Sequence, residues 1–167
     1  MASKSAPLST AKRVISALSD RKLSIVTAES CTGGMIAAAL TDVPGSSAAL
    51  FGGFITYSNE AKASMIHVQP RLIQDYGAVS NQVARAMADG ARNTANADIA
   101  VSSTGIAGPD GGSDKKPVGL VYVAVSTELA TVVIEHQFGD IGRDEIRKAT
   151  VEAALELVLQ VVSSDDD

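Results

Sequence analysis

Short apolar runs typical of buried strands alternate along this sequence with segments whose apolar residues recur at helical spacing. Residues 98–103 form a nearly continuous apolar run, as strands of a parallel sheet do. Strands are also expected at 23–28, 51–57, 119–127 and 131–137. Few residues separate the last two runs, which indicates an antiparallel pair. The alternation predicts an α/β fold, a three-layer α/β/α sandwich on a mixed sheet of about five strands.

Helix signals fill the intervals between these runs. Six helices are expected. One follows a cap at Ser9 or Thr10, one covers 34–41, one starts near Asn59, one runs from Pro70 to Gly77, one follows a cap at Ser80, and one covers 143–162. The apolar face of the first is Ala11, Val14, Ile15 and Leu18. The last is expected to bury Ile146, Thr150, Ala153, Leu157 and Val161. No repeat or composition shift appears, so residues 1–167 are expected to form one domain with its core over 11–162, a short polar N-terminus and an acidic tail.

Charge and composition exclude several classes of partner. The chain of 167 residues has a net charge of −5 and 4% aromatic residues, which argues against a nucleic-acid partner. No run approaches the roughly 20 apolar residues of a membrane span, and the polar N-terminus lacks the apolar stretch of a secretory signal. We therefore expect a cytoplasmic protein with no membrane partner. A homo-oligomer is also expected, with a dimer as the working hypothesis, although no residue pattern fixes that state.

Residue types that often build catalytic or metal sites are scarce. Cys31 is the only cysteine, which excludes an internal disulfide and a multi-cysteine metal site. The only histidines, His67 and His136, lie in apolar or strand-like surroundings, so a Ser-His-Asp triad is not expected. We therefore expect no metal and no cofactor. If a serine is the nucleophile, lysine is the only abundant residue type that remains as its base.

One segment joins a strand to a helix and concentrates polar chemistry, Thr27-Ala28-Glu29-Ser30-Cys31-Thr32-Gly33-Gly34. Helix N-termini present unpaired N–H groups and partial positive charge, which suit an anion, a developing oxyanion or an activated nucleophile. Such a position can also lower a thiol pKa, so Cys31 is an alternative nucleophile to Ser30. In the plainest interpretation, Ser30 or Thr32 is only an N-cap and the glycines only permit a turn.

A second candidate segment, Tyr57 to Lys62, follows the strand at 51–57. A lysine beside a strand end can be partly desolvated, which lowers its pKa and makes it a base. The alternative is an ordinary solvated helix lysine.

A third segment, 102–112, ends a strand with three hydroxyls and continues into a glycine-rich loop. Backbone N–H groups in such a loop can bind phosphate or carboxylate, although the spacing is neither a P-loop nor a dinucleotide fingerprint. A plain flexible connection is the alternative. Lys115 and Lys116 follow, and either add positive charge or are simply exposed.

Two arginines, Arg143 and Arg147, stand four residues apart near the start of the last helix. Arginines there oppose the helix dipole, which favours an anionic partner such as Glu29 or a bound phosphate. Local pairs with Asp140 or Asp144 are the alternative.

Four motifs occur here in one order, and together they resemble the C-terminal domain of the competence/damage-inducible CinA family. They are Ala28 to Gly34, Gly53 through Tyr57 to Lys62, Gly77-Ala78-Val79-Ser80, and Thr104 to Pro109 with Lys116-Pro117-Val118-Gly119. The resemblance covers residues 11–162. It implies an α/β/α fold with a mixed five-stranded sheet and an amidohydrolase that converts nicotinamide mononucleotide (NMN) and water to nicotinate mononucleotide and ammonia, a step of pyridine nucleotide metabolism and NAD salvage.

The resemblance also implies residue roles. Ser30 is the nucleophile, Lys62 the base and Tyr57 a close neighbour, and either Lys62 or Tyr57 takes the proton. The residues expected to contact substrate are Glu29, Cys31, Thr32, Gly33, Gly34, Thr104, Gly105, Ala107, Gly108, Arg143 and Arg147.

The sequence departs from the family pattern in one place. The family usually runs Gly-Asp-Arg directly, whereas Ile141 and Gly142 separate Asp140 from Arg143 here. The departure bears on the role of Arg143 and keeps a non-catalytic nucleotide-binding or regulatory module of the CinA type as the alternative function. Many relatives also carry a large N-terminal molybdopterin-binding-like domain, and we expect none of its activity here.

Overall fold

The computed structural model describes residues 5–164, and its centre is one mixed five-stranded sheet in the order β2-β1-β3-β4-β5. The strands are β1 (Ile25–Glu29), β2 (Leu50–Ile55), β3 (Ile99–Gly105), β4 (Leu120–Ser126) and β5 (Thr131–Gln137). β1 pairs in parallel with β2 and β3, whereas β4 pairs antiparallel with both of its neighbours. The mixed sheet and the antiparallel β4–β5 pair were both expected from the sequence.

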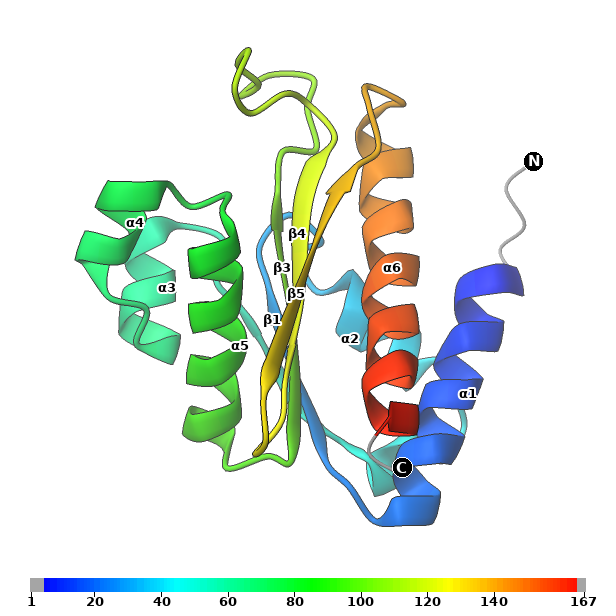
Figure 1. The fold of residues 1–167 in the computed structure, drawn as a ribbon. Coiled ribbons are helices and arrows are strands. Elements are labelled where there is room, and N and C mark those ends of the chain that lie inside the picture. Colours follow the sequence, from blue (N-terminus) through cyan, green and yellow to red (C-terminus); the bar gives the residue numbers. More distant parts are fainter. Residues whose placement is uncertain (1–4, 165–167) are drawn as a thin grey trace.

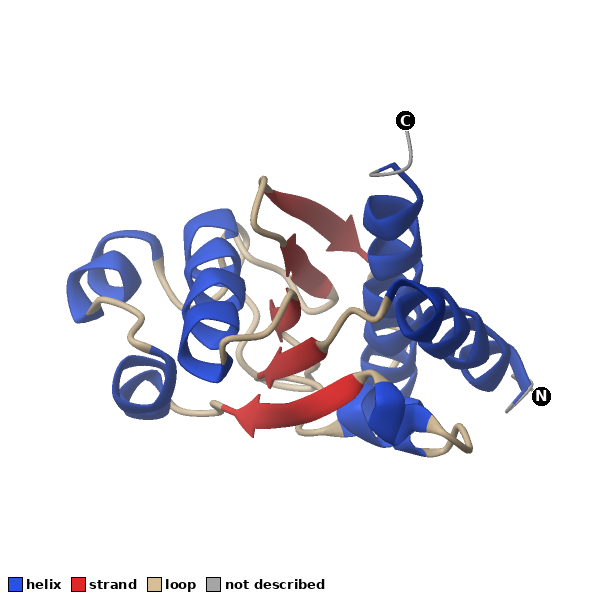
Figure 2. Ribbon diagram, turned by 90° about the horizontal axis from the view of Figure 1, so that it is seen from below, coloured by secondary structure: helices blue, strands red, loops and turns tan. Residues whose placement is uncertain are grey.

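Helices cover both faces of the sheet (Figures 1 and 2), which confirms the α/β fold with three layers. One layer holds α1 (Ser5–Arg21), α2 (Met35–Thr41) and α6 (Arg143–Ser164), with the short 3-10 helix η1 (Ser46–Ala48) after α2. The other layer holds α5 (Asn81–Ala95), with α3 (Asn59–Ile66) and α4 (Pro70–Tyr76) outside it. No helix within residues 5–164 is both long and apolar enough to cross a bilayer.

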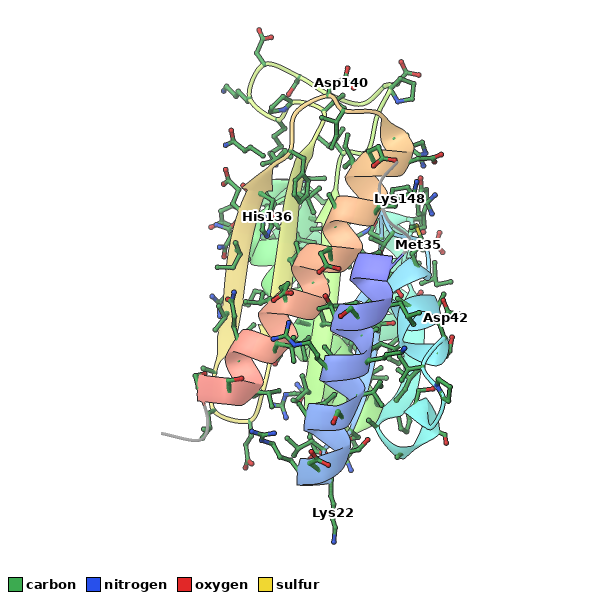
Figure 3. All side chains as sticks on the ribbon, turned by 90° about the vertical axis from the view of Figure 1, so that its right-hand side faces the viewer. Lys22, Met35, Asp42, His136, Asp140 and Lys148 are labelled. Carbon is green, nitrogen blue, oxygen red and sulfur yellow. The ribbon has the colours of Figure 1, made fainter. Side chains whose placement is uncertain are left out.

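Two helices differ from the sequence prediction. α1 begins at Ser5 rather than after a cap at Ser9 or Thr10, although the predicted face of α1 is buried. α6 buries a wider face than one helical stripe, because it packs against both the sheet and α1, which lies beside it (Figure 3). The additional buried side chains of α6 include Val151, Leu155 and Val158.

The connections of β1 create a crevice at its carboxyl end. The chain leaves β1 through α2 on one face of the sheet to reach β2, and returns through α3, α4 and α5 on the other face to reach β3. In open α/β sheets, ligands bind where neighbouring connections leave toward opposite faces. The glycine-rich segment 106–119, which joins β3 to β4, rises from the same end of the sheet (Figure 1).

Candidate active site

Ser30 directly follows β1 and is held against β3. Its backbone N–H donates to the carbonyl of Ser103 at 3.0 Å, and the residue is 8% exposed. α2 begins only at Met35, with Gly34 as its N-cap at φ 104°. The expectation that Ser30 lies at a helix N-terminus is therefore wrong, and so is the alternative that Ser30 or Thr32 caps the helix through its side chain.

Glu29 occupies the helix N-terminus instead. Its carboxylate is fully buried and accepts from the backbone N–H groups of Ile36 at 2.8 Å and Ala37 at 3.0 Å. The hydroxyls of Thr32 and Thr27 donate to the two oxygens of the same carboxylate at 2.7 Å and 3.1 Å. Glu29 does not line the cavity beside Ser30. We therefore assign Glu29 to fixing the turn that carries the nucleophile, in place of the expected substrate contact.

The turn after Ser30 is also fixed from α6. Arg147 donates to the carbonyls of Cys31 at 3.0 Å and Thr32 at 3.2 Å, so its guanidinium holds this turn instead of facing a ligand. Gly33 adopts φ 57°, and a Cβ atom there would lie 3.4 Å from that guanidinium. Thr32, Gly33, Gly34 and Arg147 all lie outside the cavity lining. They belong to or hold the turn after Ser30 without lining the cavity, although substrate contact was expected of all four.

Replacing Glu29 with glutamine tests this assignment. Each Glu29 carboxylate oxygen accepts from a backbone N–H, and the glutamine NH₂ group cannot accept a hydrogen bond. At least one buried N–H is then left unpaired, which costs about 1–3 kcal/mol. We expect the free energy of unfolding, measured in urea, to fall by that amount. Glu128→Gln in the exposed turn between β4 and β5 is the control and should change stability little. An equal change in both variants would contradict the assignment.

Lys62 is buried at 1% exposure and points at Ser30. Its Nζ lies 3.1 Å from Ser30 Oγ, 2.8 Å from the carbonyl oxygen of Thr56 and 3.2 Å from that of Tyr57. A neutral amine has two N–H donors and one lone pair, so the two carbonyls can take both donors while the Ser30 hydroxyl donates to the lone pair. The alternative of a solvated helix lysine is wrong.

Local structure places Lys62 there. Ser58 caps α3 by accepting from the backbone N–H of Ala61 at 3.0 Å, which sets the start of the helix. At the other end of α3, the carbonyl of Ile66 approaches Gly90 of α5 so closely that a Cβ atom at Gly90 would clash with it. The backbone N–H of Thr56 donates to the Glu29 carbonyl at 2.9 Å and brings the two lysine acceptors beside Ser30.

Burial sets the protonation of the two reactive neighbours of Ser30. Desolvation lowers the pKa of Lys62 from 10.5 to about 8, so a substantial fraction is neutral near physiological pH. Desolvation raises the pKa of the Cys31 thiol to about 11, with Glu29 adding a smaller increase. Cys31 is therefore a protonated thiol at neutral pH, which argues against the alternative nucleophile.

The lowered pKa of Lys62 predicts a pH-dependent stability. The unfolded chain keeps this proton up to pH 10.5, whereas the folded chain releases it above about 8, so folding is penalised by a constant amount below pH 8. The penalty disappears as pH rises from 8 to 10.5. Relative to Lys62→Met, the wild type should therefore gain stability over that interval in chemical denaturation. A difference between the two proteins that is independent of pH would contradict the shift.

A cavity of about 270 Å³ opens beside Ser30 and Lys62. Among the sequence-predicted residues, its lining includes Ser30, Cys31, Tyr57, Lys62, Thr104, Gly105, Ala107, Gly108 and Arg143. The sequence analysis did not single out Asn59, Ala78, Val79, Ile106, Asp110 and Gly111 as site residues, although all of them lie in or beside the quoted motifs. A larger cavity of about 700 Å³ also borders the glycine-rich segment; it shares Asp110 and Gly111 with the smaller one and includes neither Ser30 nor Lys62.

Tyr57 and Arg143 lie at the mouth of this cavity. Tyr57 is 61% exposed, and its hydroxyl accepts from Arg143 at 3.3 Å. Arg143 also donates to the carbonyl of Gly108 at 2.7 Å. Neither Arg143 nor Arg147 pairs with an acidic side chain within the described residues, so the expected pairs with Asp140, Asp144 or Glu29 do not form. Arg143 lines the cavity despite the two extra residues before it.

The glycine-rich segment and the strand before it bond to the residues at the end of α4 and just after it. Thr104 donates to the carbonyl of Ala78 at 2.8 Å, so its hydroxyl is engaged with the protein. Lys116 donates to the carbonyl of Tyr76 at 2.6 Å, and a Cβ atom at Gly77 would lie 2.8 Å from that ammonium. The segment is therefore fixed at these points, in contrast to the alternative of a plain flexible connection.

The histidines take no part in the site. His67 caps the C-terminus of α3, and His136 stacks on Phe138 with ring centroids 5.2 Å apart. Figure 3 shows His136 on β5, at the opposite edge of the sheet from α2. No group of three or more potential metal ligands occurs between residues 5 and 164. The polar groups that line the cavity include the Ser30 hydroxyl, the Lys62 amine, the Tyr57 phenol, the Arg143 guanidinium, the Cys31 thiol and the Asp110 carboxylate.

Comparison with known proteins agrees with this architecture. The pattern that defines the CinA C-terminal domain matches residues 8–162. The chain belongs to the CinA C-terminal domain family. A CinA-like protein of Acidobacterium capsulatum is 52% identical over 139 residues, which is 83% of this chain and 33% of the relative. The chain thus spans about a third of the length of the curated relatives it matches.

Solved structures of CinA proteins have the same fold. The competence/damage inducible protein CihA from Agrobacterium tumefaciens superposes with a TM-score of 0.91 at 47% identity, covering 94% of this chain and 95% of that one. A CinA superfamily protein from Escherichia coli superposes with a TM-score of 0.90 at 31% identity, covering 96% of this chain and 93% of that one.

Proposed function

We propose that this CinA domain hydrolyses the amide of NMN to nicotinate mononucleotide and ammonia, with Ser30 as nucleophile and Lys62 as base. The observation that carries the proposal is the 3.1 Å approach of the buried Lys62 amine to Ser30 Oγ, with two backbone carbonyls beside the same nitrogen. An activated nucleophile of this kind needs a base within hydrogen-bond reach. The resemblance of the motifs to the family supplies the substrate.

The first half of the reaction follows from these positions. Ser30 Oγ attacks the amide carbon while its proton moves to Lys62 Nζ, and the C=O π electrons move to the oxygen. The lysine, now an ammonium close to Ser30, adds positive charge beside the tetrahedral intermediate. The pyridinium ring withdraws electrons and activates the amide. When the C–N bond breaks, Lys62 returns the proton to the leaving nitrogen and ammonia departs, leaving the nicotinoyl group of the nucleotide joined to Ser30 Oγ as an ester.

Water completes the cycle. Lys62, neutral again, accepts a proton from water as the oxygen attacks the ester carbon, and then returns it to Ser30 Oγ as the acyl bond breaks. The N-terminal N–H groups of Ile36 and Ala37 in α2 are bonded to Glu29 and take no part in oxyanion stabilisation. No step uses a metal or an organic cofactor.

Arg143 is the group we assign to the 5′-phosphate. It lines the mouth of the cavity, and its present partners are a carbonyl and a phenol, both uncharged. A phosphate is a stronger partner for a guanidinium than either of these. Arg147 is already bonded to two carbonyls behind the cavity and is not assigned to the phosphate.

Incubation of the purified protein with NMN tests the proposal. Ammonia is measured by a coupled enzymatic assay, and nicotinate mononucleotide by chromatography. We expect the two products in equal amounts. Binding of NMN without release of ammonia would instead support a non-catalytic nucleotide-binding module and would overturn the proposal.

A further inference from the structure

Among the described residues, the lining of the cavity beside Ser30 contains a single acidic side chain. Lys62 and Arg143 are the basic residues of the lining, and Asp110 is the acidic one. Lys62 and Arg143 are both bonded to protein oxygens. The Asp110 carboxylate is exposed and makes no hydrogen bond or ion pair with any residue between 5 and 164. Among the described residues it is therefore the one charged group of the lining with no hydrogen bond to the protein.

The position of Asp110 determines which part of a nucleotide can approach it. It lies two residues after Gly108, whose carbonyl accepts from Arg143, so the acid and the arginine come from neighbouring parts of the lining. A carboxylate repels a phosphate, which leaves the phosphate to Arg143. With the amide carbon at Ser30 Oγ and the phosphate at Arg143, the pyridinium ring and its ribose lie between the two. The ring nitrogen carries the only positive charge of NMN.

We infer that Asp110 is a specificity-determining residue that selects cationic pyridinium nucleotides over uncharged nucleotides of the same shape. The inference rests on the proposed function, because that function places the ring in this cavity. Reduced NMN is the informative comparison, since its dihydropyridine ring has no positive charge and nearly the same outline. A carboxylate in the same cavity attracts the oxidised ring and has no comparable attraction for the reduced one.

The experiment measures binding without turnover. In a Ser30→Ala background, dissociation constants for NMN and reduced NMN are determined by calorimetry with Asp110 intact and with Asp110→Asn. We expect the substitution to weaken binding of NMN by about tenfold, or roughly 1.4 kcal/mol. Binding of reduced NMN should change by less than about twofold, so the preference for the oxidised form falls about tenfold. Added salt should reduce the preference only while Asp110 is present.

Asp114→Asn is the matched control. Asp114 belongs to the same glycine-rich segment and is exposed, but it lines only the larger neighbouring cavity. We expect it to leave the preference for the oxidised form unchanged. This control separates a local contact with the ring from a general change in the charge of the segment.

The outcomes separate this inference from the proposed function. Equal weakening of both ligands by Asp110→Asn would assign Asp110 to the ribose and overturn the charge selection, as would no weakening of either. Both results leave the amidohydrolase intact, provided that the wild type releases ammonia from NMN. If neither ligand binds and the wild type releases no ammonia, the proposed function fails and the inference fails with it.

Discussion

Replacing Ser30 with alanine is expected to lower ammonia release from NMN by about three orders of magnitude or more, as loss of an attacking hydroxyl does in serine hydrolases. Alanine has no oxygen to form the ester, and Lys62 then has no proton to accept from it. Turnover is measured under single-turnover conditions, and NMN binding separately by calorimetry. Binding should survive, because the side chain that is lost is small.

Cys31→Ala is the matched comparison, because the thiol is the neighbouring nucleophile and lines the same cavity. Its pKa of about 11 keeps it protonated at neutral pH, so its loss should reduce turnover far less than the loss of Ser30 does. If Cys31→Ala abolished ammonia release while Ser30→Ala retained most of it, the nucleophile would be the thiol.

Lys62→Arg is expected to lower turnover by about two orders of magnitude or more, the usual contribution of a general base. Arginine keeps the positive charge but does not deprotonate at accessible pH. In the wild type, kcat/KM should rise with pH along a limb centred near the pKa of about 8, because only the neutral amine accepts the proton. The limb should be absent from the residual activity of Lys62→Arg.

Two further variants make the Lys62 result specific. Lys148→Arg changes an exposed lysine of α6 and should leave the pH limb in place. Tyr57→Phe removes the other candidate proton acceptor, and its effect should be much smaller, because the hydroxyl faces Arg143 at the mouth of the cavity. A larger loss from Tyr57→Phe than from Lys62→Arg would transfer the role of base to Tyr57.

The fold could be predicted because its signals are local. Apolar runs such as 98–103 and the short connection between β4 and β5 fix strand type and pairing without knowledge of distant contacts. The start of α1 could not be placed, because Ser9 and Thr10 are plausible caps within a longer helix. The wide buried face of α6 was missed because it depends on a second helix packing from outside.

The site was predictable in its residue types and less so in its geometry. Ser30, Lys62 and Arg143 were expected at the cavity and line it. The sequence analysis did not predict that Glu29, and not Ser30, occupies the N-terminus of α2. Residue spacing does not reveal that the Glu29 carboxylate accepts from the backbone N–H groups of Ile36 and Ala37.

Two other features of the site depend on contacts that the sequence does not show. Arg147 lies one helical turn from Arg143, yet it faces the turn after Ser30 instead of the cavity. Asp110 stands in a quoted loop, and only the folded chain shows that its carboxylate has no partner among residues 5–164.

The two carbonyls that accept from Lys62 belong to residues that follow an edge strand of the sheet. Thr56 and Tyr57 directly follow β2, an outermost strand that has a single neighbour, so the acceptors of the lysine protons move with that strand. A displacement of β2 by a few tenths of an ångström would weaken one or both bonds and shift the basicity of the amine. A substitution that displaced β2 would then shift the pH dependence expected for Lys62 without touching any atom of the proposed reaction.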